Sequence, residues 1–157
     1  MRRYSVLFTV LILIAISFTG CKSNDLKSFN CIEVTSYDSN GVEVETSDIS
    51  RNQNSDVMEK LENILTTGEK TSQSYEDLEK EQKYQLVFTN IGGLLGDDIA
   101  PVYFDLYLYQ DSIVFGKMVK KDNGTMIVED SYQLAKGLTV DEFKEIIENT
   151  HNTGHNK

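Results

Sequence analysis

The order of apolar and polar residues sets a long apolar run apart from a strand-rich remainder. Residues 4–18 are apolar except for Ser5, Thr9 and Ser17. After residue 30, apolar and polar positions alternate over 31–37 and 42–45, as in half-buried strands. Asn40-Gly41 lies between them and favours a tight turn, because both residue types tolerate a positive φ. The pattern therefore predicts an N-terminal β-hairpin.

Two segments show the 3.6-residue period of amphipathic helices. Capping boxes are expected from Asp56 with Glu59 in the first helix and from Thr139 with Glu142 in the second. Gly68 is expected to end the first helix. The apolar stripes are Val57, Leu61, Ile64 and Leu65 in the first helix, and Phe143, Ile146 and Ile147 in the second.

The segment from residue 84 to 130 has the richest strand pattern. Four runs (84–91, 102–109, 113–120 and 125–130) are joined by a Gly-rich loop and two short turns, which predicts an antiparallel meander. Residues 69–83 are acidic and polar, and we expect a loop there, with a short helical turn within it as an alternative. The prediction is one α+β domain over residues 30–150, with an antiparallel meander of about four to six strands including the hairpin, two helices packed on it, and a flexible tail over 151–157.

The N-terminus has the features of an export signal. Arg2 and Arg3 precede the apolar run, and Thr19-Gly20 then leads into Cys21, which fits a secretory signal peptide over residues 1–20. The run is shorter than the roughly 20 residues that span a bilayer. An uncleaved signal anchor remains the alternative. In both cases the rest of the chain lies outside the cytoplasm, with residues 21–29 as a polar tether.

The stretch Phe18-Thr19-Gly20-Cys21 resembles the lipobox of bacterial lipoproteins, with Phe18 where that family usually has leucine. The layout of signal, helix, polar loop, strands and closing helix is similar to small uncharacterised lipoproteins of Gram-positive, Firmicute-type bacteria. The resemblance implies that Cys21 is acylated and becomes the new N-terminus. Several acyl chains hold a protein firmly, so it also implies attachment to cell-membrane lipid, facing outside the cytoplasm.

Charge narrows the possible partners. Removal of residues 1–20 takes away Arg2 and Arg3 and leaves 13 basic and 25 acidic residues, a net charge of −12. Nucleic acid is excluded as a partner because phosphate binding needs clustered Lys and Arg. With Cys21 acylated, Cys31 has no disulfide partner. We expect it to be a small buried apolar residue.

Candidate chemistry is sparse. The only histidines are His151 and His155, and no third metal ligand accompanies them. The motifs of serine or cysteine nucleophiles and of phosphate loops are absent. Asp97 and Asp98 form a weak calcium candidate. We expect a protein that is not an enzyme and has no cofactor or metal site; an envelope enzyme is a distant alternative.

The most distinctive pattern is VYFDLYLY, residues 102–109. Phe104, Leu106 and Leu108 share one face of this strand and are expected in the core. The other face carries Tyr103, Asp105, Tyr107 and Tyr109, which are candidate partner-binding residues because tyrosine gives large contact area at small entropic cost. The alternatives are that helices cover this face or that the tyrosines pair across strands.

Two function classes follow from this pattern. The first is a binding lipoprotein that presents its sheet face to an envelope protein or a peptide. The second is a self-protection lipoprotein, similar to the immunity proteins that accompany antimicrobial peptides, in which a domain of charge −12 intercepts a cationic peptide.

Overall fold

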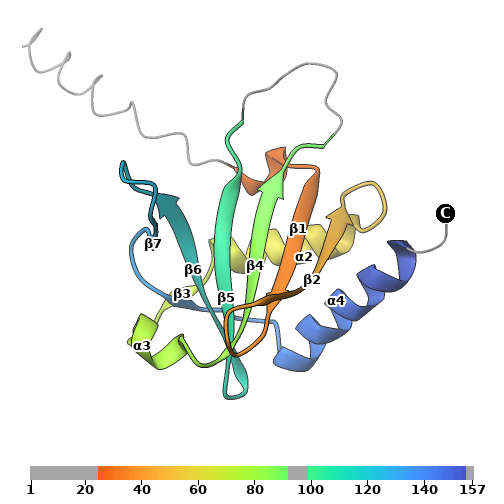
Figure 1. The fold of residues 1–157 in the computed structure, drawn as a ribbon. Helices are drawn as coiled ribbons and strands as arrows, with labels where there is room; N and C mark the ends of the chain where they lie inside the picture. The colour runs from red at the N-terminus through yellow and green to blue at the C-terminus, as the bar shows by residue number, and fades with distance from the viewer. Residues whose placement is uncertain (1–24, 92–98, 155–157) are drawn as a thin grey trace, which may run out of the picture.

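The computed structural model describes residues 25–91 and 99–154, the last four by their backbone only, and shows one antiparallel sheet with helices (Figure 1). The strands are β1 Cys31–Tyr37, β2 Glu43–Ser50, β3 Glu69–Lys70, β4 Gln82–Thr89, β5 Val102–Tyr109, β6 Ser112–Lys120, β7 Met126–Val128 and β8 Gln133–Leu134. The helices are the short 3-10 helix η1 Leu26–Ser28 and the α-helices α2 Ser55–Thr66, α3 Tyr75–Leu78 and α4 Val140–Gly154.

The strands form one sheet in the order β2-β1-β4-β5-β6-β8-β3, and β7 pairs with β6 beside β8. The predicted meander β4-β5-β6-β7 is confirmed, and the hairpin β1-β2 joins it through antiparallel pairing of β1 with β4. The hairpin turn contains Gly41 at a φ of 74°. The α+β class is confirmed, but the expected four to six strands is an undercount of the eight observed. The two missed strands, β3 and β8, have two residues each, too few to show a period.

The helices α2 and α4 both lie on one face of the sheet, as Figure 1 shows. A third α-helix, α3, corrects the expectation of two helices, and it agrees with the alternative of a short helical turn within 69–83. Its four residues contain one buried apolar side chain, Leu78, so the sequence shows no apolar stripe that would predict this helix. The side chain of Ser74 and the carboxylate of Asp77 form a capping box at its start.

The face covered by α2 and α4, here called the closed face, holds the main core. Its apolar side chains come from the strands, both helices and η1, and each is no more than 8% exposed. The predicted core positions Phe104, Leu106 and Leu108 belong to it. Phe143 of α4 is fully buried and packs edge-on against Tyr84, with ring centroids 5.0 Å apart.

The two predicted helix starts had different outcomes. The box of Thr139 and Glu142 is confirmed: the Thr139 backbone N–H donates to the Glu142 carboxylate at 2.9 Å, and the Glu142 N–H donates to Thr139 Oγ1 at 3.2 Å. The box of Asp56 and Glu59 is wrong, because α2 begins one residue earlier, with Asn54 as N-cap and no side-chain cap bond. Helix α4 continues to Gly154, past the boundary expected at residue 150.

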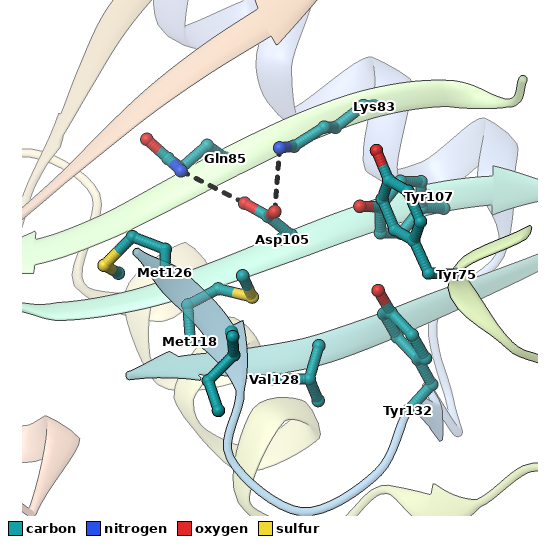
Figure 2. A pocket seen from close by; sticks show the side chains of 10 residues that line it. Tyr75, Lys83, Gln85, Asp105, Tyr107, Met118, Met126, Val128 and Tyr132 are labelled. Atoms are coloured by element: carbon teal, nitrogen blue, oxygen red, sulfur yellow. Dashed lines mark hydrogen bonds and ion pairs between the residues drawn. The ribbon is translucent and has the colours of Figure 1, made fainter. Parts of the chain in front are cut away.

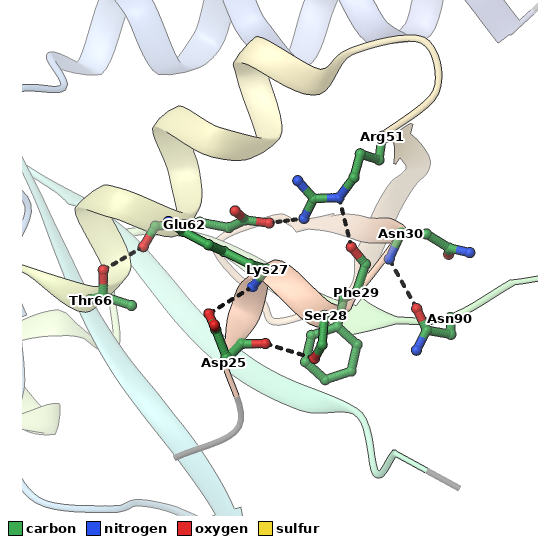
Figure 3. Close-up of polar contacts among 9 residues, drawn as sticks. All are labelled: Asp25, Lys27, Ser28, Phe29, Asn30, Arg51, Glu62, Thr66 and Asn90. Atoms are coloured by element: carbon green, nitrogen blue, oxygen red, sulfur yellow. Dashed lines mark hydrogen bonds and ion pairs between the residues drawn. The ribbon is translucent and has the colours of Figure 1, made fainter. Parts of the chain in front are cut away.

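The folded part begins before residue 30, so the expected tether over 21–29 is too long. Leu26 and Phe29 are 4% and 1% exposed and belong to the main core. Figure 3 shows the polar contacts that hold this segment: Arg51 Nε donates to the carbonyl of Phe29 at 2.9 Å, and Arg51 also pairs with Glu62. The Asn30 N–H donates to the Asn90 side chain at 3.0 Å. We call these contacts the N-terminal latch.

Candidate functional site

The opposite side of the sheet, here called the open face, is only partly covered. The segment from α3 to the start of β4 and the segment 126–134 pack over one part of it. Leu78 and Tyr132 form a second, smaller core there with Tyr107 and Val114. The alternative that helices cover the tyrosine face therefore holds only in part, because α3 contributes Leu78 while Tyr132 comes from the non-helical segment 126–134. The half of the open face on β1 and β2 is polar, with exposed Glu33 and Asp48 facing each other across the two strands.

Two adjoining cavities lie on the aromatic half of the open face, with volumes of about 540 and 600 Å³. They share Gln85, Met118 and Met126 in their walls, so we treat them as one open-face groove. The first cavity is also lined by Tyr75, Lys83, Asp105, Tyr107, Ile127, Val128 and Tyr132 (Figure 2). The second is also lined by Ala100, Pro101, Val102, Tyr103, Lys117, Val119, Lys120 and Gly124.

Asp105 lies at the middle of the groove floor and is 4% exposed. Lys83 Nζ lies 2.7 Å from its Oδ2, and Gln85 Nε2 donates to its Oδ1 at 3.1 Å, as the dashed lines in Figure 2 show. Lys83 also lies over the ring of Tyr37, 5.2 Å from its centroid. Both carboxylate oxygens thus have partners within the protein. Because a buried carboxylate without a partner is costly, Lys83 and Gln85 make this buried charge tolerable.

Two tyrosines form one wall of the groove. The rings of Tyr107 and Tyr132 pack edge to face with centroids 5.9 Å apart. Burial, and then the negative charge of Asp105, raises the pKa of the Tyr107 phenol far above its ordinary value. Burial also raises the pKa of Tyr132. Both phenols are therefore neutral at physiological pH, and the pair offers an apolar surface with hydroxyl groups instead of an acid or base.

The opposite wall is soft and apolar. Met118 of β6 and Met126 of β7 are half-buried and line both cavities. Thioether side chains adapt to differently shaped ligands. Gly116 lies beneath this wall, where an added Cβ would stand 3.0 Å from Val128 Cγ2 and 3.1 Å from the Tyr132 ring. The absence of a side chain at Gly116 lets Val128 and Tyr132 approach the sheet.

Three of the four residues expected to bind a partner line the groove. Asp105 and Tyr107 lie in the first cavity and Tyr103 in the second. Tyr109 lines neither; it packs against the second core. Sequence reasoning missed Tyr75, Met118, Met126 and Tyr132. Met118 lies on β6 directly opposite Tyr103, Met126 reaches the groove through the pairing of β7 with β6, and Tyr75 and Tyr132 come from segments outside these strands. No spacing within one segment therefore connects the four residues.

The remaining chemical candidates have structural explanations or lie outside the described residues. Cys31 is buried, and burial followed by the charges of Asp48 and Glu33 raises its pKa to about 11, so its thiolate is suppressed. Over residues 25–91 and 99–154, no three His, Cys, Asp or Glu side chains are grouped to hold a metal ion. Cys21, Asp97, Asp98 and His155 fall outside the described residues, as does the side chain of His151.

Neither of the two long helices could serve as a membrane span: in the part of the chain that the structure describes, no helix combines the necessary length and apolarity. Comparison with protein-family models, with curated proteins and with solved structures returned no match.

Proposed function

We propose that this chain is a lipid-anchored lipoprotein outside the cytoplasm that binds an extended peptide segment of an envelope partner in its open-face groove, without catalysing a reaction. The observation that carries this proposal is the groove itself. It combines tyrosine and methionine walls with one polar centre at Asp105, Lys83 and Gln85. Concave, mostly apolar sites with a few placed polar groups are typical of ligand sites.

The shape of the groove favours an extended peptide over a compact ligand. One cavity lies at the start of β5, beside Val102 and Tyr103, and the other lies farther along, beside Asp105 and Tyr107. The groove therefore follows the strand direction. A peptide in it can place apolar side chains against Met118 and Met126. Its backbone groups can bond to the Gln85 amide and the tyrosine hydroxyls, which meets the need of buried backbone groups for partners.

The anchor is the part of the proposal that the sequence supports. Arg2 and Arg3, the apolar run over 4–18 and the small residues before Cys21 fit a cleaved and acylated signal. A short anchor is also compatible with the position of η1, which begins only five residues after Cys21 and contributes Leu26 to the folded core.

The self-protection function is the second candidate, and the net charge of −12 after removal of residues 1–20 favours it. In this case the groove ligand is a cationic antimicrobial peptide. The charge does not come from the groove centre, because Lys83 balances Asp105 there. Attraction would come from the net negative charge of the domain as a whole and would weaken with salt.

Methionine methyl signals give a direct test of the groove. The chain from Cys21 onward contains three methionines: Met118 and Met126 in the groove, and Met58 fully buried in the closed face. We would label their methyl groups with 13C and titrate cationic, neutral and anionic synthetic hexapeptides. The proposal expects the signals of Met118 and Met126 to shift while that of Met58 stays in place.

The matched variants are Tyr75→Ala, which removes an exposed groove residue, and Val44→Ala, which removes an exposed apolar side chain that lines neither cavity. Tyr75→Ala should weaken the titration, and Val44→Ala should not. A preference for cationic hexapeptides would favour the self-protection function. If no peptide class moves either groove methionine, the proposed binding site is wrong.

Intact mass tests the anchor independently. Protein extracted from membranes should begin at Cys21 and carry acyl mass, and Cys21→Ala should lose both features. A full-length chain without acyl mass would reject the lipoprotein assignment and favour an uncleaved signal anchor.

A further inference from the structure

We infer that one end of the domain, the end from which the N-terminus leaves, rests on the surface of an anionic bilayer, with the groove opening at that surface. This inference rests on the proposed anchoring at Cys21. It adds an orientation and a second contact, made by the folded domain itself with phospholipid headgroups.

The strand registers define this end of the molecule. Cys31 at the start of β1 pairs with Thr89 at the end of β4, and Phe88 pairs with Val102 at the start of β5. Tyr103 in turn pairs with Met118 near the end of β6. The segments 25–30, 90–91, 99–101 and 120–125 are therefore gathered at one end, which we call the anchor end; Figure 1 shows them together at the top.

The N-terminal latch fixes where the chain leaves the domain. Leu26 and Phe29 are buried, Arg51 holds the Phe29 carbonyl, and Asn30 exchanges hydrogen bonds with the backbone of Ile91 at 2.9 and 3.1 Å. Asp25 is only four residues after Cys21. Four residues span at most about 14 Å even when fully extended. The eight-residue strand β5 is longer, about 27 Å, so a lipid on Cys21 keeps the anchor end near the bilayer.

Charge distinguishes the two ends over the residues that the structure describes. The anchor end carries Lys27, Lys120 and Lys121 against Asp25 and Asp122, with Glu59 of α2 beside Lys27. The opposite, distal end carries Lys80 and seven acidic residues: Asp38, Glu43, Glu76, Asp77, Glu79, Glu81 and Asp111. An anionic surface therefore repels the distal end more strongly than the anchor end. Exposed apolar side chains occur at both ends, Ile91 at the anchor end and Val44 near the distal end.

In this orientation, the groove opens at the membrane surface. The second cavity is lined by Pro101, Lys120 and Gly124, which belong to the anchor end. The first cavity extends from there toward Tyr75 and Tyr132 at the other end of the groove. A peptide that lies on the membrane, or emerges from it, can therefore enter the groove without leaving the surface.

Single tryptophans test the orientation, because the natural chain contains none. Ile91→Trp reports from the anchor end, and Val44→Trp, at an equally exposed apolar position near the distal end, is the matched control. We would reconstitute the acylated protein in vesicles of phosphatidylglycerol and brominated phosphatidylcholine. Ile91→Trp should lose at least about half of its emission, as expected for an aromatic ring at the headgroup boundary, and Val44→Trp should lose almost none. Equal urea midpoints would show that both variants fold.

A second preparation separates this inference from the anchoring proposal. The chain starting at Cys21 is coupled through that thiol to a maleimide lipid; Cys31 does not compete because it is buried. If membrane-extracted protein lacks acyl mass, the anchoring proposal fails, and the coupled protein still reports orientation. If the anchor is present but Ile91→Trp is not quenched, or both tryptophans are quenched equally, the orientation inference is overturned.

Lysines at the two ends of the domain can be compared directly. Lys120→Glu/Lys121→Glu should reduce quenching of Ile91→Trp at least about twofold in vesicles with phosphatidylglycerol, because two attractive charges become repulsive. Lys80→Glu, at the distal end, should leave quenching unchanged. Equal quenching in the double variant and its parent would overturn the role of charge in orienting the domain.

Discussion

The two faces of the sheet are built from the same strands but differ in what fills the space above them. On the closed face, α2 and α4 cover mainly aliphatic and phenylalanine side chains, each no more than 8% exposed. On the open face, a four-residue helix and a short hairpin cover only part of the strands, and two cavities remain between tyrosines and methionines. The closed face therefore supplies most of the stability, and the open face has room for a ligand.

The same strand contributes differently to the two faces. In β5, Phe104 and Leu106 enter the main core, while Asp105 between them is buried on the other side and needs Lys83 and Gln85. A buried ion pair is weak evidence for stability, because desolvation offsets much of the attraction. We therefore expect substitutions on the closed face to change the free energy of unfolding, and substitutions on the open face to change binding or local order as well.

The largest effect should come from removing a closed-face ring. Phe143→Ala deletes a fully buried side chain that packs on Tyr84, and such deletions cost about 3–5 kcal/mol of unfolding free energy. Urea unfolding measures the loss. The methyl signals of Met118 and Met126 should stay in place in the folded fraction; if they shift as much as that of Met58, the two faces are coupled more tightly than the structure indicates.

Breaking the polar centre of the open face should come next. Lys83→Met leaves the buried Asp105 carboxylate without its cation and should cost about 2 kcal/mol, less than the full loss of a buried pair because Lys83 is partly exposed. Lys117→Met is the control: its pair with Glu129 is exposed on both sides, and such pairs contribute about 0–1 kcal/mol. Equal costs in urea unfolding would mean that burial of Asp105 has no special energetic role.

Two glycines compare the packing of the faces directly. An added Cβ at Gly68 would lie 2.4 Å from Cζ of Phe115 in the main core, whereas at Gly116 the nearest atom is 3.0 Å away on Val128. Gly68→Ala should therefore destabilise by about 1–3 kcal/mol. Gly116→Ala should cost less, because Val128 and Tyr132 border the groove and can move into it. Urea midpoints rank the two variants, and a larger cost for Gly116→Ala would contradict a compliant open face.

The smallest effect concerns the start of α4 and depends on pH. Hydrogen bonds from the backbone and then the side chain of Thr139 lower the pKa of Glu142 below its ordinary 4.5. A carboxyl whose pKa is lowered by folding contributes stability above its unfolded pKa and loses it as the pH falls through the folded value. Wild-type stability should therefore decline below about pH 4.5 more steeply than that of Glu142→Gln. Glu145→Gln, an exposed neighbour, is the control, and parallel pH curves for Glu142→Gln and wild type would exclude the capping carboxylate as a source of acid sensitivity.

The sequence by itself determined the elements that have a period or a local chemical signature. Alternation identified β1, β4, β5 and β6, the apolar stripes identified α2 and α4, and the box of Thr139 and Glu142 marked the start of α4. These features succeed because each depends on side chains one to four residues apart, whose positions the backbone geometry of a strand or helix fixes. The two-residue strands lack such a period and were missed, and the four residues of α3 could be expected only as a possible helical turn.

Only the tertiary structure decided which face of β5 is covered and what surrounds Asp105. The sequence placed Tyr103, Asp105, Tyr107 and Tyr109 on one face, but Tyr75, Met118, Met126 and Tyr132 reach the same region through the fold of α3 and the hairpin of β6 and β7. The tertiary structure also shows that Leu26 and Phe29, which were expected in a tether, belong to the core. The physical reason is that cavities and burial depend on contacts between residues distant in the chain, and no local pattern encodes which distant segment will fill a given space.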